Sequence, residues 1–156
     1  MRAMHKIISA CLLLAGAVAL AATPRHSAPV ISPQSEEPVP AFHGQVPKGE
    51  LPETMSPLLF PDTIVQNAYI AAARVKKTLY QEPCYCHCDQ SQGHASLLDC
   101  FVSRHGSGCN ICMGEAFYSY EQLKKGRTAA QIREGIMKGE WQKVDMAKYQ
   151  KPLPAK

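Results

Sequence analysis

Cysteine and histidine side chains crowd into one short part of this chain. The stretch Cys84-Tyr85-Cys86-His87-Cys88 places thiols at alternate positions, Cys100 follows it, and Cys109-Asn110-Ile111-Cys112 adds a further pair. Cysteines two positions apart cannot close a relaxed disulfide with each other, because the ring between them is too short for normal disulfide geometry. A metal ion, by contrast, can take alternate residues of a wrapped loop as ligands. The spacing therefore favours a thiolate-rich metal site.

The pair Cys109 and Cys112 has a second possible chemistry. Its spacing puts the two sulfurs one turn apart on one face of a helix that we expect to begin near Cys109. The positive end of a helix lowers the pKa of a thiol there and favours the thiolate, which either binds metal or attacks a disulfide. This pair is the alternative redox pair of a thiol–disulfide oxidoreductase.

Three interpretations of the cysteines compete. Soft sulfur ligands select Zn(II), Cu(I) or an iron–sulfur cluster over Mg(II) or Ca(II). An even number of cysteines in a small exported protein is, however, also typical of a disulfide framework, with the domain then serving as a binding module. A dithiol enzyme would be expected to show alternating strands and helices, and the sequence shows no such pattern. We predict metal binding, and we keep the other two as alternatives.

The predicted metal ligands are every cysteine of this region and one histidine. His105 lies between two of the cysteines, although it could instead interact with the carbonyls at a helix end. His94 and His87 are single histidines of a kind found more often on the surface than on a metal, and whether they bind stays open. The predicted ligands are Cys84, Cys86, Cys88, Cys100, Cys109, Cys112 and His105.

The elements that must position these residues are helices. Asp62 can cap a first helix that buries a stripe from Ile64 to Val75, and Leu79 continues that stripe. A short second helix is expected over residues 96–104, and a third from Cys109 to Gly126. No alternating strand pattern occurs. We expect an all-α fold, a small bundle of about four helices around a cysteine-rich loop.

The fourth helix has the clearest start signal. Thr128 and Gln131 match a capping box, and Ile132 and Ile136 face inward behind it. The compact domain is then predicted to span residues 57–141, near the lower size at which an apolar core is sufficient. Small domains of this kind usually carry disulfides or a metal.

The first 21 residues read as a signal peptide. Arg2 and Lys6 precede an uncharged apolar run that ends in small residues, with Ala19-Leu20-Ala21 as the expected cleavage box. A spanning helix needs about 20 apolar residues, and this run falls short. Cys11 is not placed for lipid attachment, because most of the apolar run follows it. Cleavage would leave an exported protein without a membrane span.

The segments that flank the domain are predicted to be flexible. Residues 22–56 are rich in proline and read as a disordered linker, and residues 142–156 read as a basic, flexible tail. The chain has 17 basic and 13 acidic residues, so removal of Arg2 and Lys6 leaves a net charge of +2. A charge so close to zero does not suggest a nucleic-acid partner.

The cysteine motif resembles a known family. Pro83-Cys84-Tyr85-Cys86-His87-Cys88 is similar to the signature of the bacterial PCYCGC-motif family of small exported proteins and lipoproteins, with His87 at the position of the signature glycine. Residues 97–101, His105-Gly106 and Cys109 to Cys112 look like the rest of that domain. The resemblance implies a bacterial source and a shared thiol-rich site that does not require His87. It supplies no activity.

We therefore expect a non-enzymatic protein of the periplasm or extracytoplasmic cell envelope that holds Zn(II) or Cu(I). Its partner is then a metal ion, in metal handling or in a structural site. Metal-protease, serine-nucleophile and phosphate-loop motifs do not occur in the sequence.

Overall fold

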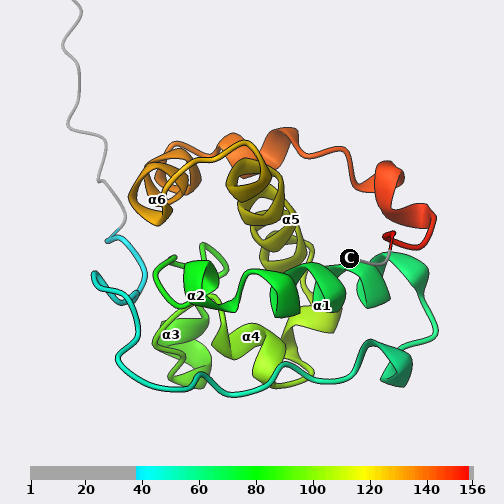
Figure 1. Ribbon diagram of the computed structural model, residues 1–156. Coiled ribbons are helices and arrows are strands. Elements are labelled where there is room, and N and C mark those ends of the chain that lie inside the picture. Colours follow the sequence, from blue (N-terminus) through cyan, green and yellow to red (C-terminus); the bar gives the residue numbers. More distant parts are fainter. Residues whose placement is uncertain (1–37, 155–156) are drawn as a thin grey trace, which may run out of the picture. The chain divides into compact units, whose positions relative to one another are not determined.

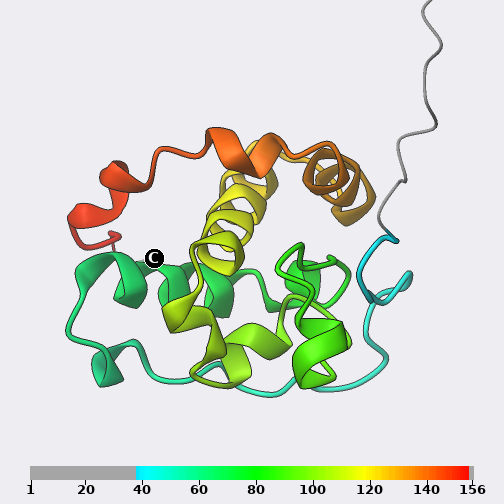
Figure 2. The same ribbon diagram turned by 180° about the vertical axis from the view of Figure 1, so that it is seen from behind.

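The computed structural model describes residues 38–154, and within them the fold is all-helical, as predicted. The predicted signal peptide and the first part of the linker lie outside this range. Six α-helices and four short 3-10 helices follow one another, with no strand in the described part (Figures 1 and 2). In chain order they are η1 (Pro57–Leu59), α1 (Thr63–Arg74), α2 (Lys76–Leu79), α3 (Cys88–Gln92), α4 (Asp99–Val102), η2 (His105–Gly108), α5 (Asn110–Lys124), α6 (Ala129–Met137), η3 (Glu140–Lys143) and η4 (Met146–Gln150).

Helix α1 begins where its cap predicts. The Asp62 carboxylate accepts a hydrogen bond from the backbone N–H of Val65 at 3.0 Å. The expected stripe is buried at Ala68 and Ala72, and Leu79 continues it from α2 after a break at Val75. This face packs against α5.

Helix α5 is the central element of the described chain. It contacts α1, α6, η2 and η3, and the ribbon shows it running between the α1 layer and the α6–η3 layer (Figures 1 and 2). Because neighbours cover it on several sides, its residues from Cys112 to Tyr120 are all buried. Its first turn is thereby held against the cysteine-rich loop.

Helix α6 confirms the predicted capping box. The backbone N–H of Gln131 donates to the Thr128 hydroxyl, and the Gln131 side chain accepts from the Thr128 N–H. Ile132 and Ile136 are buried and form a second, smaller apolar cluster with Tyr118.

Two short helices differ from expectation. The predicted helix over 96–104 is reduced to α4, because the Asp99 carboxylate accepts from the N–H groups of Ala95 and Ser96 and holds a turn there, while Ser103 is extended. Helix α3 occupies part of the predicted loop. It is a single turn that begins after His87, and Gly93 ends it with a φ of 70°.

The segments before residue 57 and after residue 141 both contact the helices. The N–H of Met55 donates to the Phe101 carbonyl at 2.9 Å. Beyond η3, Tyr149 is buried and stacks on Phe117 with ring centroids 3.6 Å apart. Asn67 fixes the same end of the chain by donating to the carbonyl of Tyr149 at 2.7 Å. Among residues 38–154, no helix is both long and apolar enough to cross a membrane.

Candidate metal centre

Five cysteine sulfurs converge on one point of the fold from four elements. Cys84 and Cys86 lie on the loop after α2, Cys88 begins α3, Cys100 lies on α4, and Cys112 lies in the first turn of α5. Each of these sulfurs belongs to at least one group of three donors whose ligand atoms all lie within 4.8 Å of one another. The structure thus gathers residues that are far apart in the sequence.

One trio of sulfurs is compact and nearly equilateral. The Sγ atoms of Cys84, Cys86 and Cys112 are 3.4 Å apart in each of the three pairs. Cys84 and Cys112 are buried, and Cys86 is partly exposed. Three sulfurs at this spacing outline one triangular face of a metal coordination shell.

A second trio shares Cys84 with the first. Cys88 and Cys100 have their sulfurs 3.3 Å apart, and the Cys100 sulfur lies 3.9 Å from that of Cys84. All three cysteines of this trio are buried. The His94 Nδ1 atom lies 3.3 Å from the Cys100 sulfur, so an imidazole stands beside this trio.

His105 connects the two trios. Its Nε2 atom lies 3.7 Å from the Cys86 sulfur, and it forms one group with Cys86 and Cys88 and another with Cys100 and Cys112. Gly106 allows this approach, because a Cβ at that position would lie 2.9 Å from the Cys100 carbonyl oxygen. The predicted ligand His105 therefore lies among the sulfurs.

Cys109 is placed differently from the other predicted ligands. It is the N-cap residue of α5, is partly exposed, and belongs to none of the four donor groups found in residues 38–154. Burial raises the pKa of its thiol to about 12. His94 differs in the opposite direction. The sequence did not decide whether it binds metal, and the fold brings it into contact with Cys100.

Glu115 is a site residue that sequence reasoning missed. It is buried, and one of its carboxylate oxygens accepts a hydrogen bond from the backbone N–H of Tyr85 at 2.8 Å, which ties the cysteine loop to α5. Burial raises the pKa of this carboxyl well above its usual value. The available signal was an acidic residue one turn after Cys112 in a helix that is otherwise apolar there.

The thiols perturb one another strongly. Hydrogen bonds from neighbouring thiols lower the pKa of three cysteines. Cys84 is the main cause for Cys86. Cys100 is the main cause for Cys88 and for Cys112, and the pKa of Cys112 falls to about 3. The same kind of contact raises the pKa of Cys84 and Cys100. The cluster therefore mixes thiolates with thiols that share protons, and a cation that displaced those protons would stabilise the thiolate form throughout.

No disulfide joins these cysteines in the structure. All six cysteines between Cys84 and Cys112 are free, and the sulfurs of the close pair Cys88 and Cys100 are 3.3 Å apart, whereas a disulfide bond is about 2.05 Å long.

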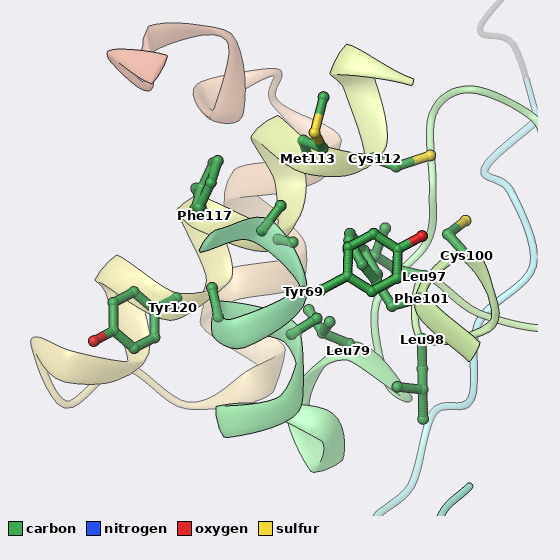
Figure 3. Packing of buried hydrophobic residues seen from close by; sticks show 14 of the residues in the cluster. Tyr69, Leu79, Leu97, Leu98, Cys100, Phe101, Cys112, Met113, Phe117 and Tyr120 are labelled. Carbon is green, nitrogen blue, oxygen red and sulfur yellow. The ribbon is translucent and has the colours of Figure 1, made fainter. Parts of the chain in front are cut away.

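Apolar side chains surround the cluster on its inner side. Figure 3 shows Cys100 and Cys112 on the side of the main core that is remote from Tyr120, and Phe101 and Leu97 belong to the same core. Phe101 and Leu97 are completely buried. Cys86, His94 and His105 keep partial exposure, so the cluster has a dry base and one side open to solvent.

Comparison with known proteins places the chain in a family. Residues 50–154 match the family described as "Protein of unknown function with PCYCGC motif". The chain belongs to the PCYCGC family. No curated protein and no solved structure matches it significantly.

The backbone conformation at His87 explains why the family motif has a glycine at this position. His87, at the place of the motif glycine, has a φ of 54° and is the one non-glycine residue with positive φ in the described chain. Glycine adopts this left-handed conformation without cost, whereas other residues are strained in it. The kink lets Cys86 and Cys88 turn toward different trios.

Proposed function

We propose that this protein binds a metal ion, Zn(II) or Cu(I), through the clustered thiolates, and that it is not an enzyme. The observation that carries the proposal is the convergence of five cysteine sulfurs and His105 in overlapping groups of three, each with its donor atoms within 4.8 Å of one another. Sulfur and imidazole donors favour these two ions over hard cations.

The depth of the cluster also supports metal binding. Cys84, Cys88, Cys100 and Cys112 are all buried, and several neighbouring thiols within 4 Å cannot all be ionised there without a compensating cation. A domain of this size gains stability from such an ion, because metal binding to a site absent from the unfolded chain adds directly to folding free energy.

The alternative is a dithiol oxidoreductase that uses Cys109 and Cys112. The raised pKa of Cys109 disfavours it as an attacking thiolate, while the low pKa of Cys112 would suit that role. Cys112, however, contacts Cys84 and Cys86 at 3.4 Å, which ties it to the cluster. We therefore rank metal binding first.

A set of serine variants tests the proposal against this alternative. Cys86→Ser and Cys112→Ser should each lose metal and stability, because they remove ligands of one coordination shell, and the double variant should cost much less than the sum of the two. Cys109→Ser is the matched control, which should keep its metal. Metal content and insulin reduction are measured on all four proteins. Reductase activity that survives Cys86→Ser and disappears in Cys109→Ser, with no metal in any variant, would establish the alternative.

Export to the periplasm or cell envelope is part of the proposal and rests on the N-terminal sequence. We expect the mature protein to begin at Ala22 and to lack Cys11. Intact-mass analysis of protein isolated from its own cells checks this. The full-length mass, or a lipid on Cys11, would contradict it.

A further inference from the structure

The geometry points to two metal ions rather than one, held as a pair by Cys84 as a shared, bridging thiolate. This inference rests on the proposed function and makes it more specific. The donors around the cluster are the sulfurs of five cysteines and the imidazoles of His105 and His94. Two tetrahedral ions that share one ligand need seven donors, and this set supplies seven.

The first ion would lie among Cys84, Cys86, Cys112 and His105. The three sulfurs are 3.4 Å apart, and His105 Nε2 stands 3.7 Å from Cys86. In a tetrahedral site with Zn–S bonds of about 2.3 Å, neighbouring sulfurs are about 3.8 Å apart. The trio therefore has to expand by only a few tenths of an ångström to hold the ion. His105, which shares one donor group with Cys86 and another with Cys112 but none with Cys84, would be the fourth ligand.

The second ion would lie among Cys84, Cys88, Cys100 and His94. Cys100 is 3.3 Å from Cys88 and 3.9 Å from Cys84, and all three donors fall within 4.8 Å of one another. His94 Nδ1 lies 3.3 Å from the Cys100 sulfur. His94 belongs to none of the four donor groups of the described residues, so its ring has to move toward Cys84 and Cys88 to become the fourth ligand. The rings of His94 and His105 meet edge to face at 5.2 Å, so the two terminal imidazoles lie side by side.

Cys84 is placed as a bridge requires. It is buried and is the one residue common to both sulfur trios, and its sulfur contacts Cys86, Cys112 and Cys100. Sulfur can donate to two ions at once, since a thiolate has more than one lone pair.

Charge balance favours a pair of divalent ions. A single divalent ion would leave most of the charge of five thiolates uncompensated in a largely buried cluster, which is costly. Two divalent ions neutralise nearly all of it. The inference thus selects Zn(II) or an ion of the same charge and geometry over Cu(I).

Metal stoichiometry is the first test. Reduced, metal-free protein is loaded with excess Zn(II), desalted and weighed by native mass spectrometry, and the same protein is loaded with ¹¹³Cd(II) for NMR. We expect two ions per chain, and two cadmium resonances that split each other through the shared sulfur. One ion at saturation, or two resonances without mutual coupling, would overturn the bridged pair and leave metal binding intact. Binding of Cu(I) alone would also overturn it, and no metal at all would overturn both proposals.

Variants separate the two ions. His94→Ala should weaken one ion at least tenfold and leave the other unchanged, whereas His87→Ala, in the same segment, should keep both. Cys86→Ser should leave one ion, and Cys84→Ser should weaken both. Circular dichroism of each variant distinguishes loss of a ligand from loss of fold. If the cysteine variants do not fold, His94→Ala decides, because it removes a partly exposed side chain. Two tightly bound ions in Cys84→Ser, or in His94→Ala, would contradict the assignment.

Discussion

At the scale of single residues, the backbone at His87 links the family motif to the architecture of the cluster. A left-handed conformation costs an L-residue roughly 1–2 kcal/mol, while glycine adopts it freely. In this chain that cost falls on the residue between two of the clustered cysteines. The strain therefore lies at the residue that precedes α3 and separates Cys86 of the first trio from Cys88 of the second.

A matched pair of substitutions tests this account of His87. Both His87→Gly and His87→Ala remove the imidazole, but only glycine adopts the positive φ without strain. We expect His87→Gly to be more stable than His87→Ala by about 1 kcal/mol, with metal content unchanged in both. Thermal denaturation of the two variants side by side measures the difference. Equal stabilities would contradict the strain, and loss of metal in both would make His87 a ligand.

At the scale of elements, the chain after α6 closes the core. Tyr149 on η4 lies in a region rich in lysine, yet it is 5% exposed, stacks on Phe117 and donates a hydrogen bond to Glu121 at 2.9 Å. Tyr149 therefore packs on the C-terminal half of α5, at Phe117 and Glu121, and so helps to hold the helix that bears Cys112.

The burial of Tyr149 makes a prediction about stability. Tyr149→Ala should destabilise the fold by about 3 kcal/mol, because removal of a large buried aromatic side chain leaves a cavity. Lys148→Ala, one residue earlier and exposed, is the control and should change stability little. Chemical denaturation measures both. A loss below about 1 kcal/mol in Tyr149→Ala would mean that this segment does not belong to the cooperative unit.

Local signals explain what the sequence could predict of these elements. Asp62 and the Thr128–Gln131 capping box act within one turn, so the starts of α1 and α6 could be predicted. The turn α3 has no apolar period, and Tyr149 lies in a polar segment whose burial depends on a partner far away in the chain.

The metal site shows the same difference between local signals and contacts made by residues far apart in the chain. The cysteines and His105 were found from their types and spacing, which are local. The contact of His94 with Cys100, and the position of Cys109 outside the four donor groups, depend on how α3, α4 and α5 meet. Such arrangements follow from tertiary packing, which spacing alone does not encode.

At the scale of the whole molecule, the metal cluster and the fold are expected to be one cooperative system. The cysteines come from the loop after α2 and from α3, α4 and α5, so metal bound among them joins that loop to those three helices. Because such a site cannot exist in the unfolded chain, metal binding should raise stability and metal removal should loosen the domain.

The most direct measurement of the central claim counts reactive thiols and metal together. Protein isolated from its own compartment, without added reductant, is treated with an alkylating reagent before and after a strong chelator, and its metal content and intact mass are determined. The account predicts bound metal, thiols protected in the native protein, and alkylation once the chelator has removed the ion. A protein free of metal, with a native mass lower than the reduced mass by two hydrogens for each disulfide and thiols that respond only to reductant, would contradict it.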